Sequence, residues 1–110
     1  MKRPLLRQAA EHDIENGFAH YLQEASTDIA TAFVDAVDIA LHHIEQHPAT
    51  GSPRYGELFN APGLRSLLVS RFPYIVFYVE HDDYLDVIRL LHQHADIPAQ
   101  LQSDMPCSEG

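Results

Sequence analysis

The sequence of 110 residues lacks several features that would define a function on their own. Its one cysteine, Cys107, excludes an intramolecular disulfide and a cysteine-based zinc site. No apolar run approaches the roughly 20 residues that span a bilayer. The first residues, MKRPLLRQAAEHD, reach charge too soon for a secretory signal. We therefore expect a cytoplasmic protein that does not bind membranes.

Positive charge is also scarce: the sequence has 7 Lys and Arg but 16 Asp and Glu, which gives a formal net charge of -9. Affinity for phosphates rises with the number of Lys and Arg that release counterions, so this charge argues against direct nucleic-acid binding. The imbalance is uneven: residues 8–50 hold eight acids and no Lys or Arg, whereas residues 51–95 hold five acids and four Arg. A protein is therefore the better expected partner.

Common catalytic and cofactor motifs are missing from the sequence. There is no Gly-x-Ser-x-Gly elbow, and the three glycines within residues 51–63 match neither a P-loop nor a dinucleotide fingerprint. Among eight histidines, His43 and His47 are four residues apart and His92 and His94 are two apart, spacings that can present two metal ligands on one face. Neither pair has a third ligand at a telling spacing. We interpret them as surface histidines and expect no metal and no cofactor.

The hydrophobic pattern of the first half predicts two helices. Apolar residues recur at three- and four-residue steps from Ala10 to Ala25 and again from Ile29 to Ile44. Ser26 or Thr27 can cap the second helix, which His47-Pro48 should end. Gly17 is expected to be the soft point of the first helix. The short connection predicts an antiparallel helical hairpin.

The second half reads as a loop followed by strands. We expect a loop over residues 48–63 with one helical turn near 55–59, and then a three-stranded antiparallel meander over residues 64–70, 74–80 and 84–91. Residues 2–6 can form a short edge strand. The predicted fold is α+β in one domain over residues 1–97, with a flexible tail over residues 98–110.

Apolar residues of these strands predict an interaction surface. If the helices cover one face of the sheet, the other face is left with more apolar surface than a solitary domain normally exposes. That surface would contain Leu68, Val76, Tyr78, Ile88 and Leu90. It predicts a protein partner.

Three arginines lie in or beside the predicted strands. Arg65 and Arg71 bracket the first meander strand, and Arg89 lies among apolar neighbours in the last. An arginine at a core position is costly unless it is paired. We expect each to have either an internal acid partner, such as Asp13 or Glu57, or a role in binding or catalysis.

The order of several short motifs resembles the ParE branch of the RelE/ParE toxin superfamily, from about residue 5 to residue 98. The motifs are Ala10-x-x-Asp13-Ile14 with Tyr21-Leu22, His47-Pro48, Gly51-Ser-Pro-Arg54, Pro62-Gly63-Leu64-Arg65-Ser66-Leu67, Phe77-Tyr78, and Val87-Ile88-Arg89-Leu90-Leu91-His92 with Asp96-Ile97-Pro98.

The resemblance implies the toxin of a type II toxin-antitoxin module, a class associated with plasmid stabilization. It implies a hetero-oligomer with a cognate ParD-like antitoxin, a ribbon-helix-helix protein whose disordered C-terminal segment wraps over the toxin. It further implies DNA gyrase as the target, and hence no enzyme activity. The expected antitoxin- or target-binding residues are the five apolar residues named above together with Arg89 and His92.

Two alternatives remain open. The RelE branch cleaves messenger RNA on the ribosome, and its chemistry would fall here to Arg65, Arg71, Arg89 and His92. The chain has no Lys after Lys2, which handicaps that activity. The other alternative is a non-toxic module that binds its antitoxin and acts as a co-repressor. It is favoured by the acidity of the chain and by Gln93-His94-Ala95, where the family commonly carries an Arg.

Overall fold

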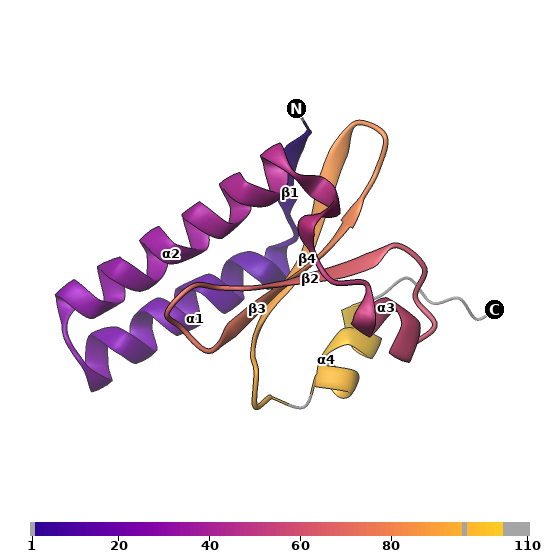
Figure 1. Ribbon diagram of the computed structural model, residues 1–110. Coiled ribbons are helices and arrows are strands. Elements are labelled where there is room, and N and C mark those ends of the chain that lie inside the picture. The colour runs from indigo at the N-terminus through magenta and orange to yellow at the C-terminus, as the bar shows by residue number, and fades with distance from the viewer. Residues whose placement is uncertain (1, 96, 105–110) are drawn as a thin grey trace.

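The structure is a computed structural model that describes residues 2–95 and 97–104. Along the chain run β1 (Arg3–Leu6), α1 (Gln8–Glu24), α2 (Thr27–Gln46), the short 3-10 helix η1 (Pro48–Thr50), α3 (Arg54–Leu58), β2 (Leu64–Leu68), β3 (Tyr74–Glu80), β4 (Tyr84–His92) and α4 (Ile97–Asp104). Figure 1 shows the hairpin of α1 and α2 on one side of the sheet and α3 and α4 on the other. The predicted α+β class is confirmed. None of the helices in the described residues combines the length and apolarity that crossing a membrane requires.

Local sequence signals set the bounds of α2. The helix begins at Thr27 because the Ser26 side chain accepts a hydrogen bond from the Ile29 N–H at 3.2 Å. It ends before His47-Pro48, as predicted. Its core-facing stripe includes Phe33 and is buried against α1 and the sheet.

Gly17 allows α1 and α2 to pack closely. A Cβ atom at this position would lie 2.5 Å from Cζ of Phe33, so only glycine leaves room for that ring. The glycine costs α1 about 1 kcal/mol of helix propensity relative to alanine. The residue that weakens the helix locally is therefore the one that seats Phe33 in the core.

The four strands form one mixed sheet in the order β1-β4-β3-β2. β2, β3 and β4 form the predicted antiparallel meander, and β1 pairs in parallel with β4 at the opposite edge. β4 is therefore central, as expected. β1 ends with Leu6 opposite Val87, so none of the described strands lies beside residues 88–92 of β4 on that edge. Helix α1 packs beside β4.

Two hydrophobic cores lie on opposite faces of the sheet. The larger core packs α1 and α2 against the sheet around Phe33, Val76 and Tyr78. The smaller core packs α3 and α4 around Phe77 and Ile88. Both faces of the sheet therefore carry helices, whereas the sequence pattern predicted helices on only one.

The C-terminal segment is the main correction to the predicted fold. A flexible tail was expected from residue 98, but Ile97–Asp104 form α4, and the side chains of Ile97 and Leu101 are buried in the smaller core. Two apolar residues four positions apart give α4 a face that binds the sheet. The rest of the predicted tail, residues 105–110 with Cys107, lies outside the described residues.

Candidate interaction surface and catalytic residues

The predicted apolar surface does not exist as one exposed face. Val76, Tyr78 and Leu90 are buried beneath the helical hairpin, and Ile88 is buried on the opposite face beneath α3 and α4. Val76, Tyr78 and Leu90 do share a face, but it is the face that the hairpin covers. Ile88 lies on the other face because the pairing register of β3 with β4 shifts between Phe77 and Tyr78. Such a shift adds a residue to β4, so Ile88 and Leu90 no longer share a face.

Leu68 is the one apolar residue of that predicted set that is exposed. Its relative exposure is 60% at the end of β2, the edge strand of the sheet. Ser52 pairs with the β2 edge at Ser66, two residues earlier, through hydrogen bonds of 2.8 and 3.0 Å. Because strand residues alternate, the N–H and C=O groups of Leu68 point to the same outer edge, beyond that bridge. An exposed side chain on an open strand edge is suited to pairing with an extended peptide.

Arg89 is bound to Asp13 of α1, which confirms the predicted internal ion pair. Its Nε and Nη2 atoms donate to the two carboxylate oxygens at 2.6 and 2.8 Å, and Nη1 donates to Oε1 of Gln100 in α4 at 3.2 Å. The side chains of Arg89 and Asp13 are only 13% and 11% exposed. The same carboxylate accepts from the Leu90 N–H at 3.1 Å, on the edge of β4 that β1 leaves open. Asp13 thus pairs the charge of Arg89 and also accepts the hydrogen bond of a backbone N–H at the open edge of β4.

A pocket of about 430 Å³ surrounds this ion pair. It lies between α1, the end of β4 and the start of α4, and its polar lining includes Asp13, His20, Tyr74, Arg89 and His92. Burial raises the pKa of Tyr74, with smaller contributions from nearby Tyr21 and Asp13. Sequence reasoning found Arg89 and His92 but missed Tyr74 and His20, because only the β3–β4 register and the α1 packing bring them together.

One ring nitrogen of His92 already accepts a hydrogen bond. Its Nδ1 atom lies 3.1 Å from the backbone N–H of His94, which donates to it, and its ring meets that of Tyr74 edge to face at 5.2 Å between centroids. A neutral ring with that acceptor carries its proton on Nε2. His92 could therefore donate from Nε2 to a ligand in the pocket.

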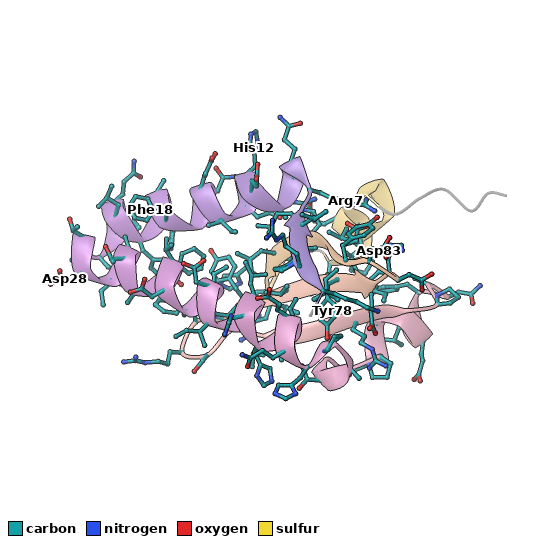
Figure 2. The ribbon with its side chains drawn as sticks, turned by 90° about the horizontal axis from the view of Figure 1, so that it is seen from above. Arg7, His12, Phe18, Asp28, Tyr78 and Asp83 are labelled. Atoms are coloured by element: carbon teal, nitrogen blue, oxygen red, sulfur yellow. The ribbon has the colours of Figure 1, made fainter. Side chains whose placement is uncertain are left out.

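Arg65 and Tyr78 together hold the loop that follows α2. Arg65 donates from Nη1 to the carbonyl oxygens of Gly51 at 2.7 Å and Ala49 at 3.3 Å. The Tyr78 hydroxyl donates to the Pro48 carbonyl at 2.7 Å and accepts from the Gly51 N–H at 3.0 Å. Burial raises the pKa of Tyr78, and the Gly51 N–H and the nearby Arg65 charge oppose that rise. Figure 2 places Tyr78 in the sheet, far from Asp28 at the tip of the hairpin.

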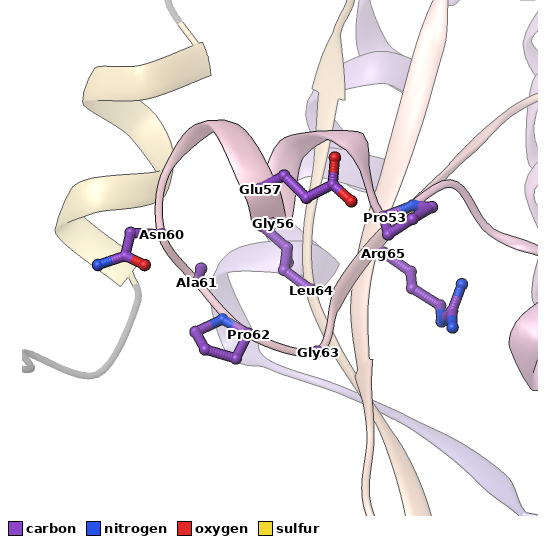
Figure 3. A pocket seen from close by; sticks show the side chains of 9 residues that line it. All are labelled: Pro53, Gly56, Glu57, Asn60, Ala61, Pro62, Gly63, Leu64 and Arg65. Atoms are coloured by element: carbon purple, nitrogen blue, oxygen red, sulfur yellow. The ribbon is translucent and has the colours of Figure 1, made fainter.

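A second pocket of about 320 Å³ lies where α3 meets β2. Figure 3 shows its lining, in which Glu57 and Arg65 are the charged residues and the Arg65 side chain points away from Asn60 and Pro62. Glu57, named above as a possible arginine partner, forms no ion pair within the described residues.

The four nuclease candidates do not form one site. Arg89 and His92 share a pocket, but Arg65 lies on the other side of β3 and binds loop carbonyls. Arg71 is exposed in the turn between β2 and β3, in a left-handed conformation with a φ of 74°. Arg65 and Arg89 are thus bound to other groups of the chain, and Arg71 lies apart from them. His92 is left beside an arginine whose charge is already paired with Asp13. In the described residues, no three His, Cys, Asp or Glu side chains gather as metal ligands.

This combination of a helical hairpin and a four-stranded mixed sheet is a known fold. It matches a solved structure from P. aeruginosa, described as its chromosomal ParDE TA system, with a TM-score of 0.71 and 18% sequence identity over 84% of this chain and 96% of that chain. No curated protein matches at a significant level. The profile of the family described as "ParE toxin of type II toxin-antitoxin system, parDE" matches residues 5–97. The chain belongs to the ParE toxin family.

Proposed function

We propose that this chain is an antitoxin-neutralised toxin that inhibits DNA gyrase, a cytoplasmic target, and that it acts by binding and not by catalysis. Membership of the ParE toxin family supports the toxin role, and gyrase is the target that the resemblance to characterised ParE toxins implies. The observation that carries the non-catalytic part is the Arg89–Asp13 ion pair. A guanidinium already bound bidentately to a carboxylate cannot stabilise a phosphate without breaking that pair.

The antitoxin is proposed to bind at the exposed end of β2. Leu68 offers an apolar side chain and an open strand edge there. An extended antitoxin segment would add a strand through main-chain hydrogen bonds and bury Leu68. The predicted contacts at Val76, Tyr78, Ile88 and Leu90 are not proposed again, because the chain itself buries them.

A gyrase supercoiling assay tests the target. Purified chain should block supercoiling at micromolar concentration, and addition of the antitoxin encoded by the neighbouring gene should restore it. Cleavage of ribosome-bound messenger RNA without any effect on gyrase would instead establish the RelE-like alternative. Tight antitoxin binding with silence in both assays would establish the co-repressor alternative.

A matched pair of variants tests the antitoxin surface. Leu68→Glu should weaken antitoxin binding at least about tenfold, because it places a charge in an apolar contact. Ile39→Glu is the control, since Ile39 is 67% exposed on α2, in the helical hairpin. Equal binding by both variants in calorimetry would place the antitoxin elsewhere.

A further inference from the structure

The C-terminal end of α2 carries three histidines, His42, His43 and His47, all exposed. The ring centroids of His43 and His47 are 5.3 Å apart, and the ring planes are tilted by 50° relative to each other. The His47 N–H donates to the His43 carbonyl at 2.8 Å, as in a helix, although the φ of −135° and ψ of 73° at His47 are no longer helical. Residues four apart on a helix lie on the same face, one turn above the other.

This separation can be compared with the geometry of a shared metal ion. A Zn–N bond of about 2.0–2.1 Å puts each imidazole centroid about 3.2 Å from the metal, and a tetrahedral angle then separates two centroids by about 5.2 Å. The observed distance of 5.3 Å agrees with that value. The spacing of the two rings is therefore compatible with a shared ion.

The surroundings also suit a cation. The carbonyl groups at the C-terminal end of a helix carry partial negative charge, which favours a positive ion there. No Lys or Arg occurs in residues 8–50, and the nearby cation is Arg65, whose guanidinium is bound to the Ala49 and Gly51 carbonyls. The Thr50 hydroxyl lies 3.2 Å from Nε2 of His43 and can accept a hydrogen bond from it, which leaves Nδ1 of His43 as the atom that would bind the metal.

The other histidines are less suited to share an ion. The rings of His92 and His94 are 5.4 Å apart, but Nδ1 of His92 already accepts the His94 N–H. His42 has Nδ1 within 3.4 Å of the Glu45 carboxylate and Nε2 within 3.1 Å of the Gln46 amide nitrogen. It lies about 100° around the helix from His43.

We propose that His43 and His47 form a two-histidine binding site for a divalent transition-metal ion such as Zn²⁺, completed by water. The ion would tie the last turn of α2 to the first residue beyond it. The loop that follows is held to the sheet by Tyr78 and Arg65, so the metal would strengthen the connection between the helical hairpin and the sheet. This site is independent of the proposed gyrase and antitoxin activities.

Isothermal titration of the EDTA-treated full chain with ZnCl₂ tests the site. We expect one equivalent bound per chain, and a fall in affinity of about tenfold or more in either His43→Ala or His47→Ala. His42→Ala is the matched control and should bind like the original chain. Because Zn²⁺ binds the folded state, it should raise the melting temperature of the chain and of His42→Ala, and much less that of the two site variants.

Two outcomes would overturn the proposal. One is the absence of saturable Zn²⁺ binding by the unaltered chain. The other is binding that survives both His43→Ala and His47→Ala, or that is lost in His92→Ala instead. Circular dichroism in EDTA shows whether each variant is folded, so a loss of binding cannot be confused with unfolding.

Discussion

At the scale of single residues, Asp13 joins α1 to β4 through hydrogen bonds to the Arg89 guanidinium and the Leu90 N–H. We expect Asp13→Ala to lower the free energy of unfolding by about 1–3 kcal/mol, because it leaves the guanidinium of Arg89 in a partly buried site without its carboxylate. It also removes the acceptor for the Leu90 N–H. Glu15→Ala, an exposed acid on the same helix, should change stability by less than about 0.5 kcal/mol.

Urea unfolding measures both variants. Arg89→Ala should also destabilise the chain, since the pair is internal and does not face a partner. An Arg89→Ala variant with normal stability and lost toxicity would show the opposite, that this arginine serves the target.

Tyr78 links stability to pH. Tyr78→Phe should cost about 1–3 kcal/mol, because the Pro48 carbonyl and the Gly51 N–H lose their buried partner. Burial raises the pKa of Tyr78 above its ordinary value of 10.0, so the folded chain keeps this proton at a pH where the unfolded chain releases it. The stability that depends on the neutral phenol is therefore complete below pH 10.0 and falls as the pH rises beyond it.

Urea titrations at about pH 8 and about pH 10.5 check this slope. Tyr78→Phe should lose less stability between the two conditions than the unaltered chain. Tyr84→Phe is a control for removal of a hydroxyl, since that group makes no hydrogen bond within the described residues. Equal slopes in the unaltered chain and Tyr78→Phe would contradict the assignment.

At the scale of elements, α4 replaces a predicted tail and completes the smaller core. Leu101 is 2% exposed, so Leu101→Ala should cost about 2–5 kcal/mol through lost burial and the cavity that remains. Ile39→Ala deletes a similar apolar volume from an exposed position and should have little effect. Thermal melting of the two variants compares them, and equal melting temperatures would mean that α4 does not stabilise the sheet.

The bounds of helices and strands could be predicted from local sequence signals, whereas the contacts between elements could not. The caps of α2, the limits of β3 and the central place of β4 follow from side chains that act within a few residues of themselves. The face on which Ile88 and Leu90 lie does not, because it depends on the shifted register of β4 against β3. Likewise, the sequence shows Gly17 only as a residue of low helix propensity. The packing of α1 against α2 shows that it leaves room for the Phe33 ring.

At the scale of the whole molecule, the charge is divided between two layers. The helical hairpin holds eight acids and no Lys or Arg, while the sheet and its loops hold all six Arg, of which Arg7, Arg65 and Arg89 are engaged internally. A partner at the β2 edge therefore meets the less acidic part of the molecule. Apolar contact at Leu68 should carry more of its affinity than charge complementarity does.

The sequence by itself determined the class of fold, the family resemblance and the exclusion of common catalytic motifs, because these depend on periodicity, spacing and composition. It also indicated that Arg89 needs an acid, since a buried cation must be paired wherever it lies. Only the tertiary structure decided that the acid is Asp13, that the predicted apolar face is covered, and that Leu68 stays exposed. These outcomes depend on which strand and helix meet, and contacts between residues more than 70 positions apart leave no local pattern.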